Sequence, residues 1–296
     1  MSIAENQVIA NQLQKTVVGK TIVKTVANQN PHKFVWFATE PRYAFTPHHD
    51  ISCREAEQYD GLLTGKRIHK TDVHSNDTYL YVGDRALLLC AISVRYYGAD
   101  EKQPKRHQLL LTFDDGSVLA VCGSLGGVIF LFEVDEDGWA IGYRNDLNNF
   151  PSLLSTDFTE EFFMNLIDGT DLTKLKPAKS VKCFLATKNR MPGLDNIILH
   201  EILWEAGVNP KSVMAALGRD EYKRMYAAIK KVLPAVISAG GRDTEKDIFG
   251  NFGGYATKAG KNTLGKPCER CGEIIVKESY MGGVIYYCPK CQPFYR

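Results

Sequence analysis

Four cysteines near the end of the chain have the spacing of a metal site. They form two C-x2-C pairs separated by 16 residues: Cys268, Cys271, Cys288 and Cys291. Each pair places two thiolates on one tight turn, and two such turns complete a closed tetrahedral shell without a position for a catalytic water. The sequence therefore predicts a structural zinc ion, Zn2+, as the cofactor of a finger over residues 263–296.

The segments between these two pairs have strand character. EIIVKES and VIYYC flank the turn Met281-Gly282-Gly283, which predicts a two-stranded hairpin with the ligands at its base. Metal binding supplies folding energy that a module of about 25 residues cannot obtain from its own core. The other four cysteines are scattered, which is typical of buried or bystander thiols in a reducing compartment. They are Cys53, Cys90, Cys122 and Cys183.

Length and composition indicate a folded globular chain. It has 296 residues, 44% of them hydrophobic, enough for a sizeable core. No run approaches the roughly 18 to 20 apolar residues of a membrane span, and the N-terminus lacks a signal-peptide pattern. We therefore expect a cytoplasmic protein, associated with the nucleoid if it is bacterial.

The charge is distributed unevenly along the chain. Residues 1–150 carry 15 basic and 18 acidic side chains, whereas residues 151–296 carry 21 and 16, a net +5. This excess is compatible with a polyanionic partner, and a solvated surface explains it equally well.

Hydrophobic patterning changes near Phe150-Pro151 and divides the chain. A possible helix at residues 4–15 is followed, up to Val134, by short segments rich in β-branched and aromatic residues, which favour an antiparallel sandwich or barrel. From Ser152 to Gly241 apolar residues recur at spacings of three and four, which predicts helices. We expect a strand lobe (1–150), a helical domain (151–241), a connector (242–262) and the finger.

The turn between two of these helical segments has the chemistry of an anion site. It reads Met191-Pro192-Gly193-Leu194-Asp195-Asn196. Proline and glycine force the turn, and backbone amides at the start of the next helix, with an asparagine beside them, suit a phosphate. Turns of this kind also join helices without any ligand, so the turn alone leaves both readings open.

Several motifs together resemble the formamidopyrimidine-DNA glycosylase and endonuclease VIII (Fpg/Nei) family over essentially the whole chain. They are Pro-Gly-Leu-x-Asn in the turn, Leu-Trp-x-Ala-Gly-x-x-Pro after it, Ala-Ile-x-x-Val-Leu, Gly-Gly-Arg-Asp and the four-cysteine finger. The resemblance implies an α+β fold with an N-terminal antiparallel β-sandwich lobe, a helix-two-turns-helix domain and a zinc hairpin. It also implies a monomer that binds double-stranded DNA, damaged or abasic, in base excision repair.

The same resemblance assigns DNA contacts. Asn196 matches the asparagine that binds DNA phosphates in the family together with neighbouring amides, among which we include Gly193. Lys33 is a further candidate contact, although a turn before a strand explains its segment equally well. Two usual phosphate contacts are missing, because Gly283 holds the place of the finger arginine and Thr78 that of a strand-lobe lysine.

The catalytic N-terminus of the family is altered. Family members begin Met-Pro-Glu-Leu-Pro-Glu, and the processed proline amine attacks the sugar C1′ while a glutamate handles protons. This chain begins Met1-Ser2-Ile3-Ala4-Glu5, so the proline and the first glutamate have no counterpart.

Two readings of this N-terminus remain. Removal of Met1 exposes the amine of Ser2, and a primary amine still forms a Schiff base, with Glu5 for acid and base work, as in a glycosylase with AP lyase activity. Alternatively, Ser2 and Glu5 are an ordinary helix start, and the chain is a DNA-binding homologue that has lost excision.

Two further segments are weaker candidates for functional sites. Residues 48–50 (HHD) could suggest a metal site, but adjacent histidines in a strand point to opposite faces, which favours a solvated loop. Residues 253–255 (GGY) lie where family members have a loop over the extruded base. A protein-binding zinc ribbon unrelated to DNA would require the match at the helical turn to be accidental.

Overall fold

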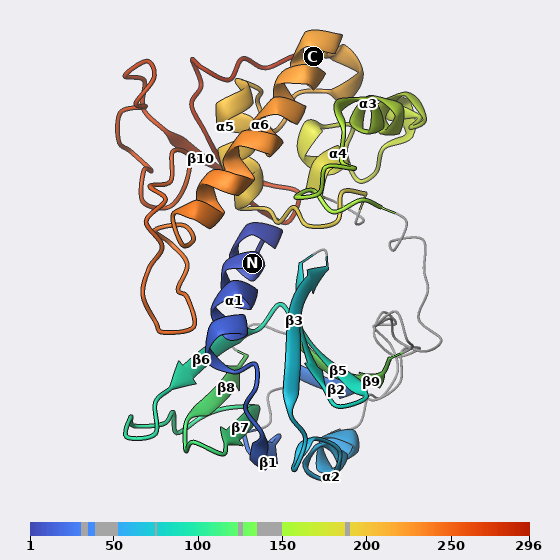
Figure 1. Ribbon diagram of the computed structural model, residues 1–296. Coiled ribbons are helices and arrows are strands. Elements are labelled where there is room, and N and C mark those ends of the chain that lie inside the picture. The colour runs from blue at the N-terminus through green and yellow to red at the C-terminus, as the bar shows by residue number, and fades with distance from the viewer. Residues whose placement is uncertain (31–34, 39–52, 75, 124–126, 135–149, 187–189) are drawn as a thin grey trace. The chain divides into compact units, whose positions relative to one another are not determined.

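The computed structural model describes residues 1–30, 35–38, 53–74, 76–123, 127–134, 150–186 and 190–296 (Figure 1). The chain forms two compact units. The strand unit contains Asn6–Asn148 and Lys246–Asn251, and the helical unit contains Met1–Glu5, Asn149–Glu245 and Phe252–Arg296. Within the described residues, no helix is both long enough and apolar enough to cross a bilayer.

Two sheets make up most of the strand unit. The first is antiparallel throughout, in the order β1 (Ile22–Ala27), β7 (Leu109–Phe113), β8 (Val118–Cys122) and β6 (Ser93–Tyr97). The second has the order β2 (Val35–Ala38), β9 (Gly127–Glu133), β5 (Arg85–Cys90), β4 (Asp77–Val82) and β3 (Ile68–His74), and only β2 and β9 pair in parallel. Leucines from both sheets are buried inside the strand unit, among them Leu87, Leu111, Leu119 and Leu131. The expected β-sandwich is confirmed.

Helix α1 (Ile3–Thr16) begins in the helical unit and continues into the strand unit. In the strand unit it buries Ile9 and Leu13, and the Thr71 hydroxyl of β3 donates to the Ala10 carbonyl oxygen at 2.9 Å. The helix predicted at residues 4–15 is therefore present.

Two parts of the strand unit were not predicted. Strand β3 was missed, as was the helical segment formed by η2 (Cys53–Gln58), a 3-10 helix, and α2 (Tyr59–Leu63). The Tyr59 hydroxyl donates to the Ile129 carbonyl oxygen at 2.9 Å, which fixes α2 to strand β9. This bond joins residues 70 apart, a pairing that local sequence patterns do not contain.

The helical unit contains α3 (Glu160–Asp168), α4 (Val181–Ala186), α5 (Ile198–Ala206) and α6 (Arg219–Ser238), with short 3-10 turns at Leu172–Lys174 and Met214–Ala216. Thr159 caps α3 by accepting a bond from the Phe162 amide. Gly207 ends α5 in the left-handed conformation (φ +69°), which glycine adopts without strain. A hairpin of β10 (Val276–Tyr280) and β11 (Gly283–Tyr287) completes the unit.

The connector after α6 folds back onto the end of that helix. Amides of the connector donate to carbonyls at or just after the end of α6: Gly254 to Ala239, Tyr255 to Gly241 and Gly253 to Arg242. The two backbones lie so close that a Cβ on Gly253 would stand 2.0 Å from the Gly241 carbonyl carbon and oxygen.

Substitution Gly253→Ala should therefore destabilise the helical unit by about 1–3 kcal/mol, the usual cost of overpacking a well-packed site. Differential scanning calorimetry measures the effect as a lower Tm. The matched control is Gly61→Ala in α2, where no atom lies within 4 Å of the added Cβ and stability should hold or rise slightly. Equal Tm values for Gly253→Ala and wild type would contradict the close approach.

Candidate metal centre and anion-binding turn

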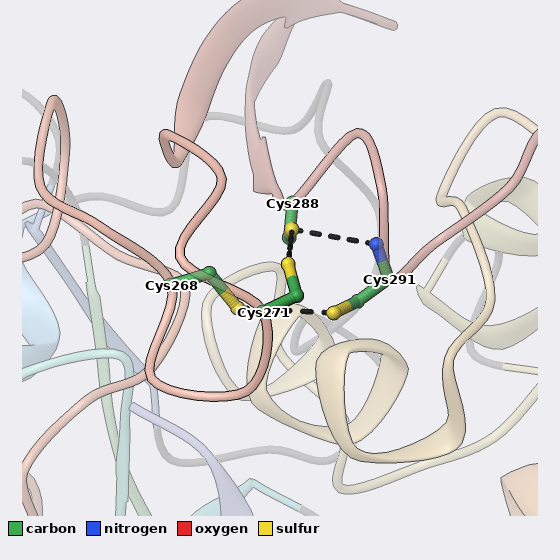
Figure 2. Close-up of side chains that lie close together, drawn as sticks. All are labelled: Cys268, Cys271, Cys288 and Cys291. Atoms are coloured by element: carbon green, nitrogen blue, oxygen red, sulfur yellow. Dashed lines mark hydrogen bonds between the residues drawn. The ribbon is translucent and has the colours of Figure 1, made fainter.

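The four cysteines of the predicted finger converge on one point. Their side chains point toward one another from the two loops at the base of the β10–β11 hairpin (Figure 2), and their sulfur atoms all lie within 4.8 Å of one another. All four are free thiols: Cys268, Cys271, Cys288 and Cys291. The fold thus brings together the four cysteines that the C-x2-C spacing predicted as metal ligands.

The sulfur positions fit a tetrahedral metal ion. Sulfurs at the corners of a tetrahedron with metal–sulfur bonds of ~2.3 Å are ~3.8 Å apart. The sulfurs of Cys268 and Cys291 are 3.9 Å apart, and those of Cys271 and Cys288 are 3.4 Å apart. Four close thiolates also repel one another, so a divalent cation is needed to ionise them together.

Hydrogen bonds around Cys268 already favour its thiolate. Burial opposes ionisation, but backbone N–H groups and the Trp204 indole N–H, 3.4 Å from the sulfur, lower the pKa of Cys268 to about 7. Burial and the neighbouring sulfurs instead raise the pKa of Cys288 and of Cys291. The Arg270 guanidinium stacks 4.2 Å from the Trp204 ring and donates to the Trp204 carbonyl oxygen, which fixes that indole.

The predicted turn before α5 contacts the hairpin. The Asn196 side-chain amide donates to the Val284 carbonyl oxygen at 3.0 Å, and its Oδ1 has no partner among the described residues. Gly193 adopts φ +104°, and its carbonyl oxygen accepts the Ile3 amide at 3.0 Å. Turn, N-terminus and hairpin therefore meet within the helical unit.

Asp195 occupies part of the anion site that the sequence predicted. Its Oδ1 accepts bonds from the backbone amides of Ile197 and Ile198, at 3.0 and 2.7 Å. Its Oδ2 lies 3.7 Å from the Met1 amine and 3.7 Å from Arg242. The chain's own carboxylate thus caps the start of α5, and the amides there are not free for a phosphate.

The N-terminal candidates are buried and held by Arg242. Ser2 is 0% exposed; its backbone N–H donates to Glu5 Oε2 at 3.1 Å and its hydroxyl donates to the same oxygen. The other oxygen of Glu5 accepts from Arg242 Nε at 2.5 Å. The structure thus brings Ser2 and Glu5 together, with Glu5 also paired to a guanidinium.

Other residues singled out in the sequence lie elsewhere. Thr78 is buried on β4, where its hydroxyl donates to the Asn6 side chain at 3.1 Å. Gly283 is the first residue of β11. Lys33 and residues 48–50 lie outside the described residues.

Sequence reasoning missed two charged residues near these groups. Arg242 is 0% exposed and Lys182 is 5% exposed. Arg242 was visible in the Gly-Gly-Arg-Asp motif, but its partner Glu5 lies 237 residues away. Lys182 stands in an apolar helix, VKCFLA, which offers no local signal of its surroundings.

The chain is similar to known proteins named formamidopyrimidine-DNA glycosylases. A family model for the formamidopyrimidine-DNA glycosylase H2TH domain matches residues 151–247. Formamidopyrimidine-DNA glycosylases of Carboxydothermus hydrogenoformans and Prochlorococcus marinus are 34% and 33% identical over 55% and 48% of this chain. These alignments cover 56% and 49% of the relatives, so the chain spans about half their length. The enzyme of Shouchella clausii is 28% identical over 81% of this chain and 86% of the relative.

Solved structures show the same fold. The chain resembles a Lactococcus lactis Fpg in complex with DNA containing an abasic site, with a TM-score of 0.76, 23% identity and 99% of each chain covered. Fold and site therefore define a protein with a β-sandwich lobe, a helix-two-turns-helix region and a four-cysteine finger. Residues 151–247 match the family model, and over most of its length the chain is similar in sequence to formamidopyrimidine-DNA glycosylases and in fold to a Lactococcus lactis Fpg.

The Trp204 indole gives a test of the metal centre. Substitution Trp204→Phe keeps an aromatic ring under Arg270 but removes the N–H that bonds the Cys268 sulfur. Outer-shell bonds of this kind contribute roughly tenfold to a hundredfold in metal affinity, so affinity should fall by that factor. Competition with a chromophoric chelator measures it.

The control is Tyr226→Phe, which removes a bond to the Phe158 carbonyl oxygen away from the cysteines. It should leave metal affinity unchanged. If Trp204→Phe and Tyr226→Phe bind metal as wild type does, the indole does not support the thiolate.

Proposed function

We propose that this chain binds double-stranded DNA at damaged or abasic positions, in the manner of a base excision repair protein. The observation that carries the proposal is the full-length similarity to a Lactococcus lactis Fpg, whose structure is a complex with abasic-site DNA. The basic excess of residues 151–296, net +5, supports a polyanionic partner for the helical half of the chain.

Asn196 is the proposed phosphate contact of the turn. One N–H of its amide is used by Val284, and the second is available for a phosphate oxygen. Gly193 shapes the turn, since its positive φ suits glycine and a Cβ there would press on Ile3 and Leu153 at 3.2 Å. Lys33 remains a predicted contact of the strand unit.

Substitution Asn196→Ala should weaken binding to every duplex sequence by roughly tenfold, because a phosphate contact carries no sequence information. The slope of log affinity against log salt should barely change, because asparagine carries no charge. Fluorescence anisotropy with an abasic-site duplex at several salt concentrations measures both quantities.

The control is Asn165→Ala on the exposed face of α3, which should bind as wild type. Wild-type binding that is absent, or independent of salt, would refute DNA binding by this chain.

We further propose that amine chemistry depends on removal of Met1. With Met1 present, the α-amine lies 3.7 Å from Asp195 and Ser2 is buried. With Met1 removed, the Ser2 nitrogen, 3.1 Å from Glu5 Oε2 in this structure, becomes the α-amine. Glu5 is then within reach to accept its proton.

The proposed step is Schiff-base formation at an abasic site. The neutral Ser2 amine adds to the C1′ aldehyde of the ring-opened sugar, and loss of water leaves an iminium. Glu5 carries the amine proton to the oxygen of the former aldehyde, and a solvent proton completes the water that leaves, so that the iminium carries the positive charge. Later loss of the C2′ proton would allow strand cleavage, the AP lyase reaction.

Borohydride trapping tests this step. Chain processed to Ser2 should form a covalent adduct with abasic DNA, mapped to Ser2 by mass spectrometry, whereas chain retaining Met1 should form little. Ser2→Pro, which places a secondary amine at the same position, should increase trapping, because a secondary amine forms the iminium directly.

Tight binding without any adduct from processed chain would favour the alternative: a catalytically inactive homologue that retains the scaffold. The pairing of Glu5 with Arg242 supports this alternative, because it gives the glutamate a structural reason to be present.

The metal of the finger is proposed to be zinc in a structural role. Four thiolates in a closed tetrahedral set suit Zn2+, and no open position remains for a reacting water. Elemental analysis of the purified protein should give about one zinc per chain. We also propose a cytoplasmic location, with nucleoid association if the protein is bacterial, and a monomeric state, as the family resemblance implies.

A further inference from the structure

Lys182 is a buried cation without a carboxylate partner in the described chain. Its side chain lies on α4 with 5% of the residue exposed. Its Nζ donates one bond, to the Tyr280 carbonyl oxygen at the end of β10, at 2.9 Å. An ammonium group has three donors, and no described aspartate or glutamate lies within ion-pair distance of this one.

The surroundings of Lys182 do not neutralise its charge. Burial and the nearby charges of Lys182 and Arg242 together lower the pKa of His200 to about 3, although Asp195 opposes the shift, so this imidazole is neutral. Both His200 ring nitrogens lack partners among the described residues. Asp195, the acidic residue of the turn, already contacts Arg242, the Met1 amine and the start of α5.

Lys182 and Asn196 converge on the tip of the hairpin. A Cβ built on Gly283 would lie 3.6 Å from Lys182 Nζ and 3.8 Å from Asn196 Nδ2. The two donors therefore face the same small volume, which a side chain at position 283 would enter. Neither Gly282 nor Gly283 has a side chain that could fill that volume, and Gly282 is exposed to solvent.

We propose that Lys182, Asn196 and the glycine tip form a phosphate-binding site, in which Lys182 supplies the positive charge that the finger arginine supplies in the family. The site takes a DNA phosphodiester, so this inference rests on the proposed DNA binding. One phosphate oxygen accepts from Lys182 Nζ and another from Asn196 Nδ2. A bound anion gives the buried ammonium the counter-charge that the protein does not provide.

Glycine at 283 is part of this arrangement. An arginine there would place a guanidinium beside the buried Lys182 ammonium and fill the space that the phosphate needs. The charge therefore comes from α4, under the hairpin, rather than from the hairpin itself. This explains how the finger can contribute to DNA binding although it lacks the arginine.

The test compares Lys182→Gln with wild type. Glutamine keeps a donor for the Tyr280 carbonyl but removes the charge. Affinity for an abasic-site duplex should fall roughly tenfold to a hundredfold at low salt, and the salt slope should become shallower by about one, as expected for one lost ionic phosphate contact. The matched control is Lys174→Gln, an exposed lysine paired with Asp171, which should change neither quantity.

A rescue variant separates phosphate binding from support of the hairpin. In Lys182→Gln/Gly283→Arg, the arginine supplies a cation at the same volume without a neighbouring ammonium. Its salt slope should return toward that of wild type. Thermal melting and metal content of each variant confirm that the finger is intact.

Each outcome decides the proposal. A Lys182→Gln variant with wild-type affinity and slope overturns it, as does weaker binding with an unchanged slope and no rescue, which would mean a structural role. If wild type binds no duplex, the DNA proposal fails by itself. Inorganic phosphate then tests the site: a phosphate-dependent rise in Tm that Lys182→Gln abolishes supports it, and no rise in wild type overturns it.

Discussion

The helical unit depends on the burial of one guanidinium. Arg242 is fully buried, and removing such a charge from water costs several kcal/mol unless carboxylates compensate it. Its compensation comes from Glu5, at 2.5 Å, and from Asp195, at 3.7 Å. These partners belong to the N-terminus and to the turn before α5, while Arg242 itself follows α6. One buried charge therefore requires three distant segments to meet, and it holds the N-terminus against the turn.

The pairing with Arg242 weakens the argument that Glu5 is present for catalysis. A glutamate near the N-terminus suggests proton transfer when the sequence is considered alone. In the structure, the same carboxylate neutralises Arg242, and losing it would leave that charge buried and unpaired. The presence of Glu5 is thus weak evidence for chemistry. Asp195 has a similar double effect: it secures Arg242 and the Met1 amine, and it takes α5 amides that a phosphate could otherwise use.

Features with a local signal were predictable from the sequence. The four-cysteine cluster follows from the C-x2-C spacing, and most strands match runs rich in β-branched residues. Strand β3 was missed because its burial does not alternate: Ile68 and Val73 are buried, with four exposed or half-buried residues between them. Lys182 and Arg242 were missed as site residues because their hydrogen-bond partners, Tyr280 and Glu5, lie 98 and 237 residues away in the sequence. No local pattern encodes such pairings.

The hairpin joins the metal centre to the turn. At its base, the Trp204 indole of α5 bonds the Cys268 sulfur, so the metal ligands and α5 are fixed together. At its tip, Lys182 holds the Tyr280 carbonyl and Asn196 holds the Val284 carbonyl. The hairpin is thus attached to the helices at both ends. Because a module of this size has little core of its own, loss of the metal would loosen the tip as well as the base. In the proposed phosphate site, the metal would therefore act without touching the phosphate, by keeping the tip beside Lys182 and Asn196.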